Sequence, residues 1–288
     1  MRPFALGVRT LALLAAVAAI GGPKPVRAAD NADALFLRAK EAWRDRTEAR
    51  YVQYGIRLRY EYGGRSTDTW YEATYRGLDG ALSLSRIHLP GDERRLGGFA
   101  IGIFGATIFD TNPGAEVVSR LRDPAIAPAF TFGLMPHAFR PNVEPAAGDP
   151  TPEPEQSRLR EIGRVIAVNR EYRIDLAGVD HLRYGDAFHL VLTPLRDPGL
   201  NRLRDLWITT DSHVTLQETV AGILDTEPYA SATWTITYVP LGGRMYIQQI
   251  RTDDALRFGE RHVSQVRLDF VDYRFPHDVP AFTFERLL

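Results

Sequence analysis

The spacing of hydrophobic positions changes along the chain, from a helical period to a strand period. In residues 31–50, Ala39 and Trp43 fall on one helical face, and Ala, Leu, Glu and Arg dominate the segment. Asp30 or Asn31 can cap its first turn. After this segment apolar residues recur at every second position, which is the period of a strand. The pattern predicts one N-terminal helix followed by a β-sheet.

The first strand of the predicted sheet has one apolar and one polar face. In residues 52–62 the apolar positions are Val52, Tyr54, Ile56, Leu58, Tyr60 and Tyr62, and the positions between them are Gln53, Gly55, Arg57, Arg59 and Glu61. Residues 63–66 predict a hairpin turn, residues 67–76 its return strand, and residues 81–89 a third strand. The aromatic residues of this hairpin, Trp70 among them, are typical of a core or of the wall of an apolar cavity.

The middle of the chain has a different character. Residues 96–109 are uncharged and Gly-rich, and their bulky members are Phe99, Ile101, Ile103, Phe104, Ile108 and Phe109. The segment is shorter than the roughly 20 residues that a spanning helix needs, so we expect a mobile apolar cover over the sheet, with a fixed core segment as the alternative. Residues 114–121 predict a short helix. The Pro- and Glu-rich residues 142–157 predict a mobile loop.

From residue 158 to residue 275 predicted strands follow one another. The turns between them, such as residues 184–186, 197–199, 210–212 and 241–243, recur at hairpin spacing, which indicates an antiparallel meander. Its apolar face must be covered, and the N-terminal helix and a lid insertion at residues 96–140 are the available covers. The predicted fold class is mainly β (α+β): an open, strongly curved antiparallel sheet, or incomplete β-barrel, with an N-terminal helix and a lid-like helical or irregular insertion.

The first residues of the chain are typical of an export signal. Arg2 and Arg9 flank the entry to an uncharged run of about 13 residues, which small residues follow at a cleavage site. We expect a signal peptide at residues 1–28, cleaved after Ala28, with retention as an anchor as the alternative. Residues 29–288 then form a single half-barrel domain that is soluble and periplasmic or otherwise exported. Because the chain has no cysteine, its stability must come from a core and not from disulfides.

Composition and motifs give no positive indication of catalysis or of nucleic-acid binding. A net charge of -1 from 35 basic and 36 acidic residues offers no electrostatic reason for nucleic acid as a partner. Histidines lie beside an acid at residues 180–181, 211–213 and 277–278, each in a predicted turn or at a strand end. The sequence contains no hydrolase, phosphate-loop or dinucleotide motif. We therefore expect a binding protein with no catalytic residue, no metal and no cofactor.

Three stretches of the chain share features with one known family. They are FHLVLTPL (Phe188 to Leu195), LRDLWITTDSHVTLQETV (Leu203 to Val220) and FVDYRFPHDVPAFTFERL (Phe270 to Leu287). With the order of the predicted elements, they resemble the periplasmic carriers of outer-membrane lipoprotein sorting, the LolA-like family. There the stretches correspond to a strand ending in L-T-P, a strand pair across a short turn, and a Pro-containing loop leading to a short F-T-F strand. The extra length of this chain falls between residues 96 and 157.

The resemblance implies an incomplete antiparallel barrel whose concave face shields acyl chains from water beneath a lid. Arg76 corresponds to the basic residue that holds the lid in that family, although Gly77 follows it here. The implied partner is a lipid or an acylated lipoprotein. The residues expected at the cavity wall or in the lid are Val52, Tyr54, Ile56, Leu58, Tyr60, Trp70, Phe99, Ile101, Ile103, Phe104 and Ile108.

Two other classes of function stay open. The first is a non-catalytic envelope interaction or assembly protein, whose barrel is filled by its own lid and whose surface docks a partner such as an envelope membrane protein. The second is a lipid-acting hydrolase. The residues favour a monomeric binding protein over both of these classes. They do not distinguish between carrying, delivering and sensing the ligand.

Overall fold

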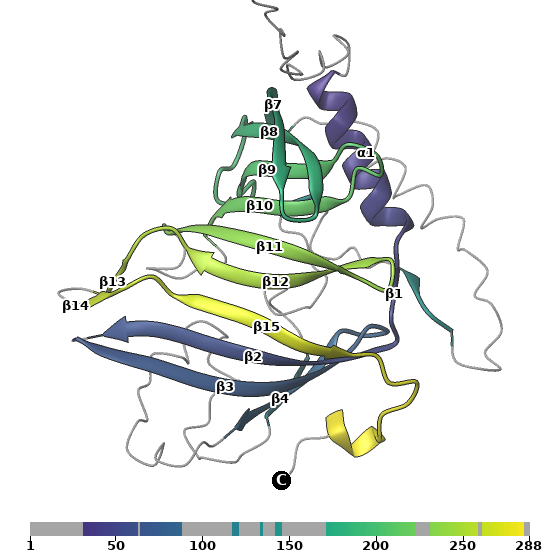
Figure 1. The fold of residues 1–288 in the computed structure, drawn as a ribbon, viewed down its shortest axis with the longest axis vertical. Helices are drawn as coiled ribbons and strands as arrows, with labels where there is room; N and C mark the ends of the chain where they lie inside the picture. Colours follow the sequence, from purple (N-terminus) through teal and green to yellow (C-terminus); the bar gives the residue numbers. More distant parts are fainter. Residues whose placement is uncertain are drawn as a thin grey trace, which may run out of the picture.

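In the residues that it describes, the computed structural model shows one α-helix beside a large β-sheet (Figure 1). It describes residues 31–62, 64–87, 117–120, 133–134, 142–145, 171–222, 231–258 and 261–284. The helical elements are α1 (Ala32–Asp45) and the 3₁₀ helix η3 (Ala281–Phe284), and the strands are β1 (Thr47–Glu48), β2 (Tyr51–Tyr62), β3 (Arg65–Arg76), β4 (Ala81–Ile87), β5 (Val117–Arg120), β6 (Asn142–Val143), β7 (Tyr172–Leu182), β8 (Gly185–Pro194), β9 (Leu203–Thr209), β10 (Thr215–Ala221), β11 (Thr233–Leu241), β12 (Arg244–Thr252), β13 (Leu256–Phe258), β14 (Arg261–Val263) and β15 (Arg267–Arg274).

Within the described ranges the main sheet contains 13 strands, and its neighbouring strands are antiparallel. Their order is β5-β4-β3-β2-β15-β12-β11-β10-β9-β8-β7, with β13 and β14 as a hairpin beside the end of β2. β1 and β6 pair separately and in parallel. In the described part of the chain the outermost strands, β5 and β7, do not pair with each other, so the sheet is open (Figure 1). The prediction of a mainly β fold with an open, curved antiparallel sheet and an N-terminal helix is confirmed.

The pairing register gathers apolar side chains on one face of the sheet, which we call the inner face. One row across it joins side chains that pair in succession: Leu176, Leu190, Leu206, Glu218, Ile236, Ile250, Leu268 and Leu58. Apart from Leu176, none of them is more than 1% exposed. Full burial of a Leu or Ile side chain contributes roughly 1.5–3 kcal/mol, so this face is the main source of stability.

Helix α1 lies over the inner face at the β7 end of the sheet (Figure 1). The side chain of Asn31 caps the helix by accepting a hydrogen bond from the backbone N–H of Asp33 at 3.0 Å. Phe36 packs edge-on against Tyr172 of β7, with 6.0 Å between the ring centres. The buried apolar residues of the helix, which join the core of the sheet, are Leu35, Phe36, Ala39 and Trp43.

The helix is shorter than the hydrophobic pattern predicts. It ends at Asp45, whereas the pattern predicted helix to residue 50, and Arg46 already has an extended backbone with φ -67° and ψ 147°. The cause is tertiary: Thr47 and Glu48 pair with β6, which a helical backbone cannot do. The three residues after Asp45 therefore point their side chains differently from a continued helix.

Two further local predictions were wrong. Residues 117–120, predicted to lie in a short helix, form β5 against β4, because its two valines favour a strand and β4 offers an edge. Residues 281–284, where the resemblance implied a short strand, form η3. In addition, Asn142 and Val143, the start of the predicted mobile loop, form β6. The rest of that loop, the predicted lid at 96–109 and the predicted signal peptide lie outside the described residues.

The opposite, outer face of the sheet carries charged side chains that pair across strands. Arg57 of β2 binds Asp68 of β3 through two nitrogens, with a shortest contact of 2.5 Å. Arg59 forms an ion pair with Asp269 of β15. Partly exposed ion pairs contribute about 0–1 kcal/mol each, so this face supports the register of the strands more than their stability.

Substitutions on the two faces of β2 should have very different effects. Ile56→Asp places an unpaired carboxylate at a position that is 0% exposed, which costs on the order of several kcal/mol. Gln53→Asp, on the outer face of the same strand and opposite Arg274, should change the free energy of unfolding by about 0.5 kcal/mol or less. Urea denaturation followed by circular dichroism measures both. Equal midpoints for the two variants would contradict the assignment of the faces.

Candidate functional site

The predicted cavity-wall residues of β2 lie together on the inner face. Val52, Tyr54, Ile56, Leu58 and Tyr60 all point to this side, and none is more than 7% exposed. Their partners on the neighbouring strands, including Ala73 of β3 and Phe270 of β15, are buried as well. These side chains form a packed apolar wall, not an open groove.

Trp70, predicted for the same wall, lies on the outer face. It pairs in register with Arg57, and the Arg57 guanidinium is 5.1 Å from the centre of the indole. The structure therefore does not bring Trp70 together with the wall residues of β2. The other predicted contact residues, Phe99, Ile101, Ile103, Phe104 and Ile108, lie outside the described residues.

Arg76, predicted to hold the lid, binds the β3–β4 turn and the C-terminal helix η3. Its Nε and Nη2 lie 2.9 and 2.8 Å from the two carboxylate oxygens of Asp79. Its guanidinium is 4.3 Å from the centre of the Phe284 ring. A Cβ atom at Gly77 would lie 2.9 Å from the Ala49 carbonyl oxygen, so only glycine allows this close approach of the chain. The described contacts of Arg76 thus anchor the end of the chain.

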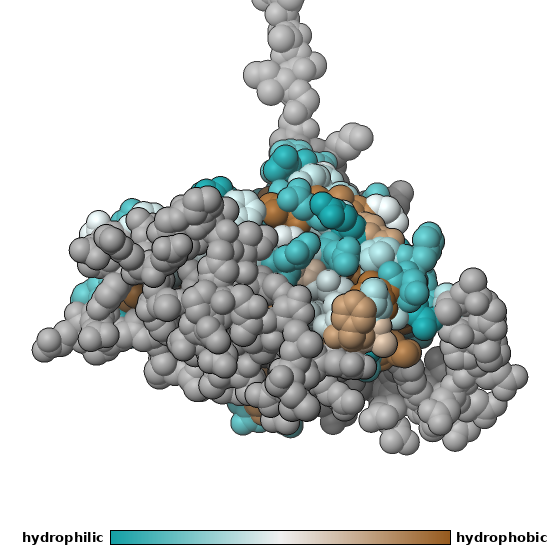
Figure 2. Space-filling view, turned by 90° about the horizontal axis from the view of Figure 1, so that it is seen from below, coloured by the Kyte–Doolittle hydropathy of each residue, from teal (hydrophilic) through white to brown (hydrophobic). Residues whose placement is uncertain are grey.

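The segments that Arg76 joins also expose large apolar side chains. Leu78, in the β3–β4 turn, is 68% exposed, and Phe282, in η3, is 66% exposed. Figure 2, which views the molecule from below, shows apolar residues among hydrophilic ones on the described surface. Single exposed apolar residues are common, so their exposure alone does not define a site.

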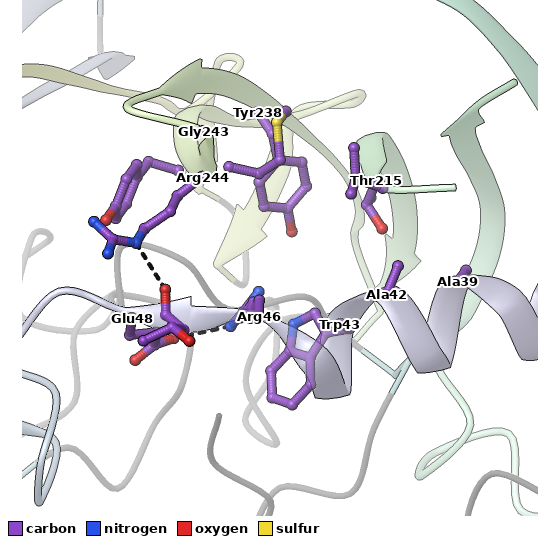
Figure 3. Close-up of a pocket in the computed structure, with 13 residues that line it drawn as sticks. Ala39, Ala42, Trp43, Arg46, Glu48, Thr215, Tyr238, Gly243 and Arg244 are labelled. Atoms are coloured by element: carbon purple, nitrogen blue, oxygen red, sulfur yellow. Dashed lines mark hydrogen bonds and ion pairs between the residues drawn. The ribbon is translucent and has the colours of Figure 1, made fainter. Parts of the chain in front are cut away.

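A partly open pocket of about 120 Å³ lies between the C-terminal turn of α1 and the β11–β12 hairpin (Figure 3). Its lining residues are Ala39, Ala42, Trp43, Arg46, Thr47, Glu48, Val214, Thr215, Tyr238, Gly243, Arg244, Met245 and Tyr246. Trp43, Tyr238 and Tyr246 also belong to the buried apolar cluster of the inner face. The pocket is smaller than the roughly 300–1,000 Å³ of pockets for drug-sized ligands, so it accommodates a fragment of a larger ligand.

Arg46 supplies the positive charge at the centre of this pocket. Its guanidinium lies over the indole of Trp43, 4.0 Å from the ring centre, and Nη2 donates to Glu48 Oε1 at 2.9 Å. The Nε atom is buried, and no described residue accepts a hydrogen bond from it. Burial lowers the pKa of Arg46, an effect that the negative charge of Glu48 and the nearby Tyr238 partly offset. In Figure 3 the side chains of Arg46 and Tyr238 point toward each other across the pocket.

Arg244, at the start of β12, closes one side of the pocket. Its Nε donates to the backbone carbonyl oxygen of Thr47 at 2.7 Å, and its Nη2 forms an ion pair with Glu144. The backbone N–H of Glu144 in turn donates to the carbonyl oxygen of Glu48 at 3.0 Å. The rim of the pocket therefore joins three segments that are far apart in the sequence.

Tyr246 contributes a buried hydroxyl to the same pocket. Its ring packs against Tyr273 and Phe275, with ring centres 5.3 and 5.1 Å away. Burial raises the pKa of Tyr246 to about 12, and the neighbouring Arg244 guanidinium offsets part of the rise. No described residue forms a hydrogen bond of normal geometry with Tyr246 Oη. Two residues of the pocket lining, Arg46 and Tyr246, thus each have a buried polar atom without a hydrogen bond of normal geometry to a described residue.

A carboxyl group lies behind the pocket, within the apolar row of the inner face. Glu218 is 0% exposed, and the hydroxyl of Tyr238 donates to its Oε1 at 2.6 Å. A buried carboxyl is tolerated only with hydrogen-bond partners, so this bond is a condition for the row to pack. Tyr238 therefore connects the pocket with the interior of the sheet.

The acid and histidine pairs of the sequence do not form a metal site in the part of the chain that is described. His181 lies 2.5 Å from Asp186 at the exposed β7–β8 turn. His189 stacks on Trp207, with 4.2 Å between the ring centres, and lies 2.9 Å from Asp205. No group of three or more candidate ligands with metal-binding geometry occurs among the described residues. The same residues include no helix with the length and apolarity needed to cross a membrane.

The residues at the polar end of the pocket were not predicted. Arg46 and Glu48 fell inside the helix expected at residues 31–50, and Arg244 was only the residue after a turn. One local feature favoured the correct boundary: Thr47 is β-branched and therefore a weaker helix former than its neighbours. The meeting of residues 46–48, 144 and 244 has no local signature.

Several solved structures are similar to this chain at low sequence identity. They include a LolA superfamily protein from Nitrosomonas europaea, with 17% identity, a TM-score of 0.40, and coverage of 89% of this chain and 98% of that one. A DUF1329 family protein from Desulfovibrio piger shares 12% identity at a TM-score of 0.41 over 88% and 95% of the two chains. A domain named for outer membrane lipoprotein sorting, from Vibrio parahaemolyticus, shares 13% identity at a TM-score of 0.42 over 88% and 97%. No protein-family model and no curated protein sequence matches the chain.

Removing the hydroxyl of Tyr238 should destabilise the protein through Glu218. Tyr238→Phe takes away a hydrogen bond from a fully buried carboxyl, so the free energy of unfolding should fall by about 1–3 kcal/mol. In a Glu218→Leu background the same substitution should cost much less, because the carboxyl is gone. Urea denaturation of the four proteins measures this coupling. Equal costs in the two backgrounds would show that the hydroxyl does not act through Glu218.

The Arg76 and Asp79 ion pair should make stability depend on pH in the acid range. The hydrogen bonds from Arg76 lower the pKa of Asp79 in the folded protein. Its contribution is therefore fully present above the unfolded-state pKa of about 3.9 and is lost as the pH falls through the lower, folded-state pKa. Arg76→Gln should lower the melting temperature more at pH 7 than at about pH 2.5. A loss of equal size at both pH values would instead assign the effect to the contact with Phe284.

Proposed function

We propose that this protein is an exported, non-catalytic binding protein that holds a hydrophobic ligand, a lipid or the acyl chains of a lipoprotein, against the inner face of its open sheet. The pocket between α1 and the β11–β12 hairpin is the observation that carries the proposal. It is partly open, and its rings from Trp43, Tyr238 and Tyr246 belong to the buried apolar cluster of the inner face. An apolar chain that enters there contacts aromatic rings that belong to this cluster.

The ligand must extend beyond the pocket, because about 120 Å³ accommodates only a part of a lipid. On this proposal the acyl chain continues along the inner face toward the wall of β2. The contact residues are Val52, Tyr54, Ile56, Leu58 and Tyr60, together with the lid residues Phe99, Ile101, Ile103, Phe104 and Ile108. The movement of such a lid would uncover the wall. Arg76 would hold the polypeptide at η3 in place while the lid moves.

A second candidate follows from the burial of the wall. Val52, Ile56 and Leu58 are at most 1% exposed in the structure, as in a sheet whose inner face is filled by its own chain. The protein would then be an envelope interaction or assembly protein without a ligand. The exposed side chains of Leu78 and Phe282 would be candidates for contact with a partner.

Native mass spectrometry distinguishes the two candidates. A carrier purified gently from the cell envelope should have a mass above that of its chain by the mass of a lipid, and should take up added lipid after extraction. Ala42→Phe fills the pocket from α1 and should lower the bound fraction about tenfold or more, since it removes the space for the ligand. Ala34→Phe, on the same helix but outside the pocket lining, is the matched control. A folded protein that never retains or takes up lipid would support the second candidate.

A further inference from the structure

The loop between β8 and β9 exposes two leucines. Residues 195–200 are all exposed, and within them Leu195 is 59% and Leu200 is 72% exposed. Five large apolar side chains are exposed in the described part of the chain, and two of them therefore lie on this one loop. The exposure of a single leucine is common, but two on one short, fully exposed loop make that loop a candidate for contact with an apolar phase.

Hydrogen bonds within the loop hold it in a defined conformation. The backbone N–H groups of Leu200 and Asn201 donate to the carbonyl oxygen of Asp197 at 2.8 and 2.9 Å. The side-chain amide of Asn201 donates to the carbonyl oxygen of Arg196 at 2.7 Å. The loop ends at Leu203, which is 0% exposed and fixes it to the core. Because the backbone is already ordered, binding through the exposed leucines costs little conformational entropy.

The same loop has an excess of positive charge. Arg196 lies between the two leucines in the sequence, and Arg202 and Arg204 follow where β9 begins. Asp197 is the one acid of residues 195–204. In the part of the chain that the structure describes, no acid forms an ion pair with Arg196, whose side chain is exposed. The whole chain has 35 basic and 36 acidic residues, so this excess is a local feature.

Two acids beside the loop already have partners. Glu171, whose carbonyl oxygen accepts a hydrogen bond from the N–H of Leu195, pairs through its side chain with Lys40 at 3.5 Å. Asp205, on β9, lies 2.9 Å from His189. These carboxylates are therefore engaged elsewhere, and the loop keeps its positive charge.

Exposed leucines beside arginines favour one kind of partner, the surface of a bilayer that contains anionic lipid. Leucine side chains gain free energy by entering the acyl region, while long arginine side chains keep their charge at the level of the phosphate groups. A bilayer adapts to the shape of an exposed loop. A protein partner would need a pocket for each leucine, and Leu is under-represented among the residues that dominate protein interfaces.

We infer that residues 195–200 form a membrane-docking loop, in which Leu195 and Leu200 enter the edge of the acyl region and Arg196 binds the phosphate groups of anionic phospholipids. The inference goes beyond the proposed function, because it needs no ligand in the pocket. A docked lipid carrier is positioned to exchange its lipid with the bilayer.

Binding to vesicles tests the inference. We expect the purified protein to sediment with vesicles of phosphatidylcholine that contain about one third phosphatidylglycerol, and about tenfold less with vesicles of phosphatidylcholine alone. Raising the salt to about 0.5 M should remove most of this difference, because salt screens the arginines. All variants are expressed and purified in the same way, so any contribution of residues 1–28 is common to them.

Two substitutions with matched controls assign the binding to the loop. Leu200→Ser should weaken binding about tenfold, and Arg196→Gln about fivefold at low salt. Leu78→Ser is the control for the first, because Leu78 is 68% exposed on another turn. Arg183→Gln, at the exposed β7–β8 turn, is the control for the second. Neither control should change binding, and all four variants should melt as the wild type does, since the positions are exposed.

A fluorescent label at the loop distinguishes insertion from attraction by charge alone. Because the sequence contains no cysteine, Leu200→Cys provides a single site for the NBD fluorophore. On the anionic vesicles its emission should shift to shorter wavelength and rise about twofold or more, because the label leaves water. The same label on Leu78→Cys should show no change.

The inference is overturned if the folded protein binds neither kind of vesicle, or if Leu200→Ser and Leu78→Ser lose equal affinity. An acidic protein then becomes the alternative partner of the loop. Equal binding to the two kinds of vesicle would overturn the assignment of an anionic surface. The proposed function is tested separately by bound lipid: Leu200→Ser should retain lipid in native mass spectrometry, and Ala42→Phe, which fills the pocket, should still bind vesicles.

Discussion

The two-residue period of strand side chains is the constraint on which the rest of the structure depends. The inner row from Leu176 to Leu58 requires the correct register in each of seven successive pairings, and a slip of one residue would turn a whole strand over. The register shifts locally where it must. Between Thr237 and Tyr238 the partner strand has one extra residue, so Tyr238 lies opposite Ile247 and both point inward. This irregularity brings Tyr238 to Glu218 on one side and to the pocket on the other.

Among the described residues, several buried polar groups lie at or next to the pocket. Glu218 interrupts the apolar row, Tyr238 binds it, and Arg46 lies across the pocket from Tyr238. A sheet optimised only for stability would have apolar residues at these positions, because buried ionisable groups rarely improve stability. Departures of this kind from an apolar core are expected at functional or strained sites.

The sequence predicted those parts of the fold whose pattern is local. The strands β2 to β4 and β7 to β12 follow from alternation and turn spacing, and so does the inner face of β2. The face of Trp70 could not follow from aromatic content, because it depends on the turn length: the pairing of Tyr62 with Arg65 places Trp70 opposite Arg57. The pocket depends on pairings between distant segments, such as β1 with β6, which no local pattern encodes.

The position of β15 has a consequence for how the chain reaches its final state. β2 lies between β3 and β15, so the first hairpin joins the rest of the sheet through the last strand. Until residues 267–274 emerge, the edge of β2 and the apolar face of the first hairpin have no strand beside them. Pairings across such a sequence distance form late and slowly. A nascent or C-terminally truncated chain would therefore expose an aggregation-prone edge, which makes the synthesis of the final strand the step that commits the protein to its fold.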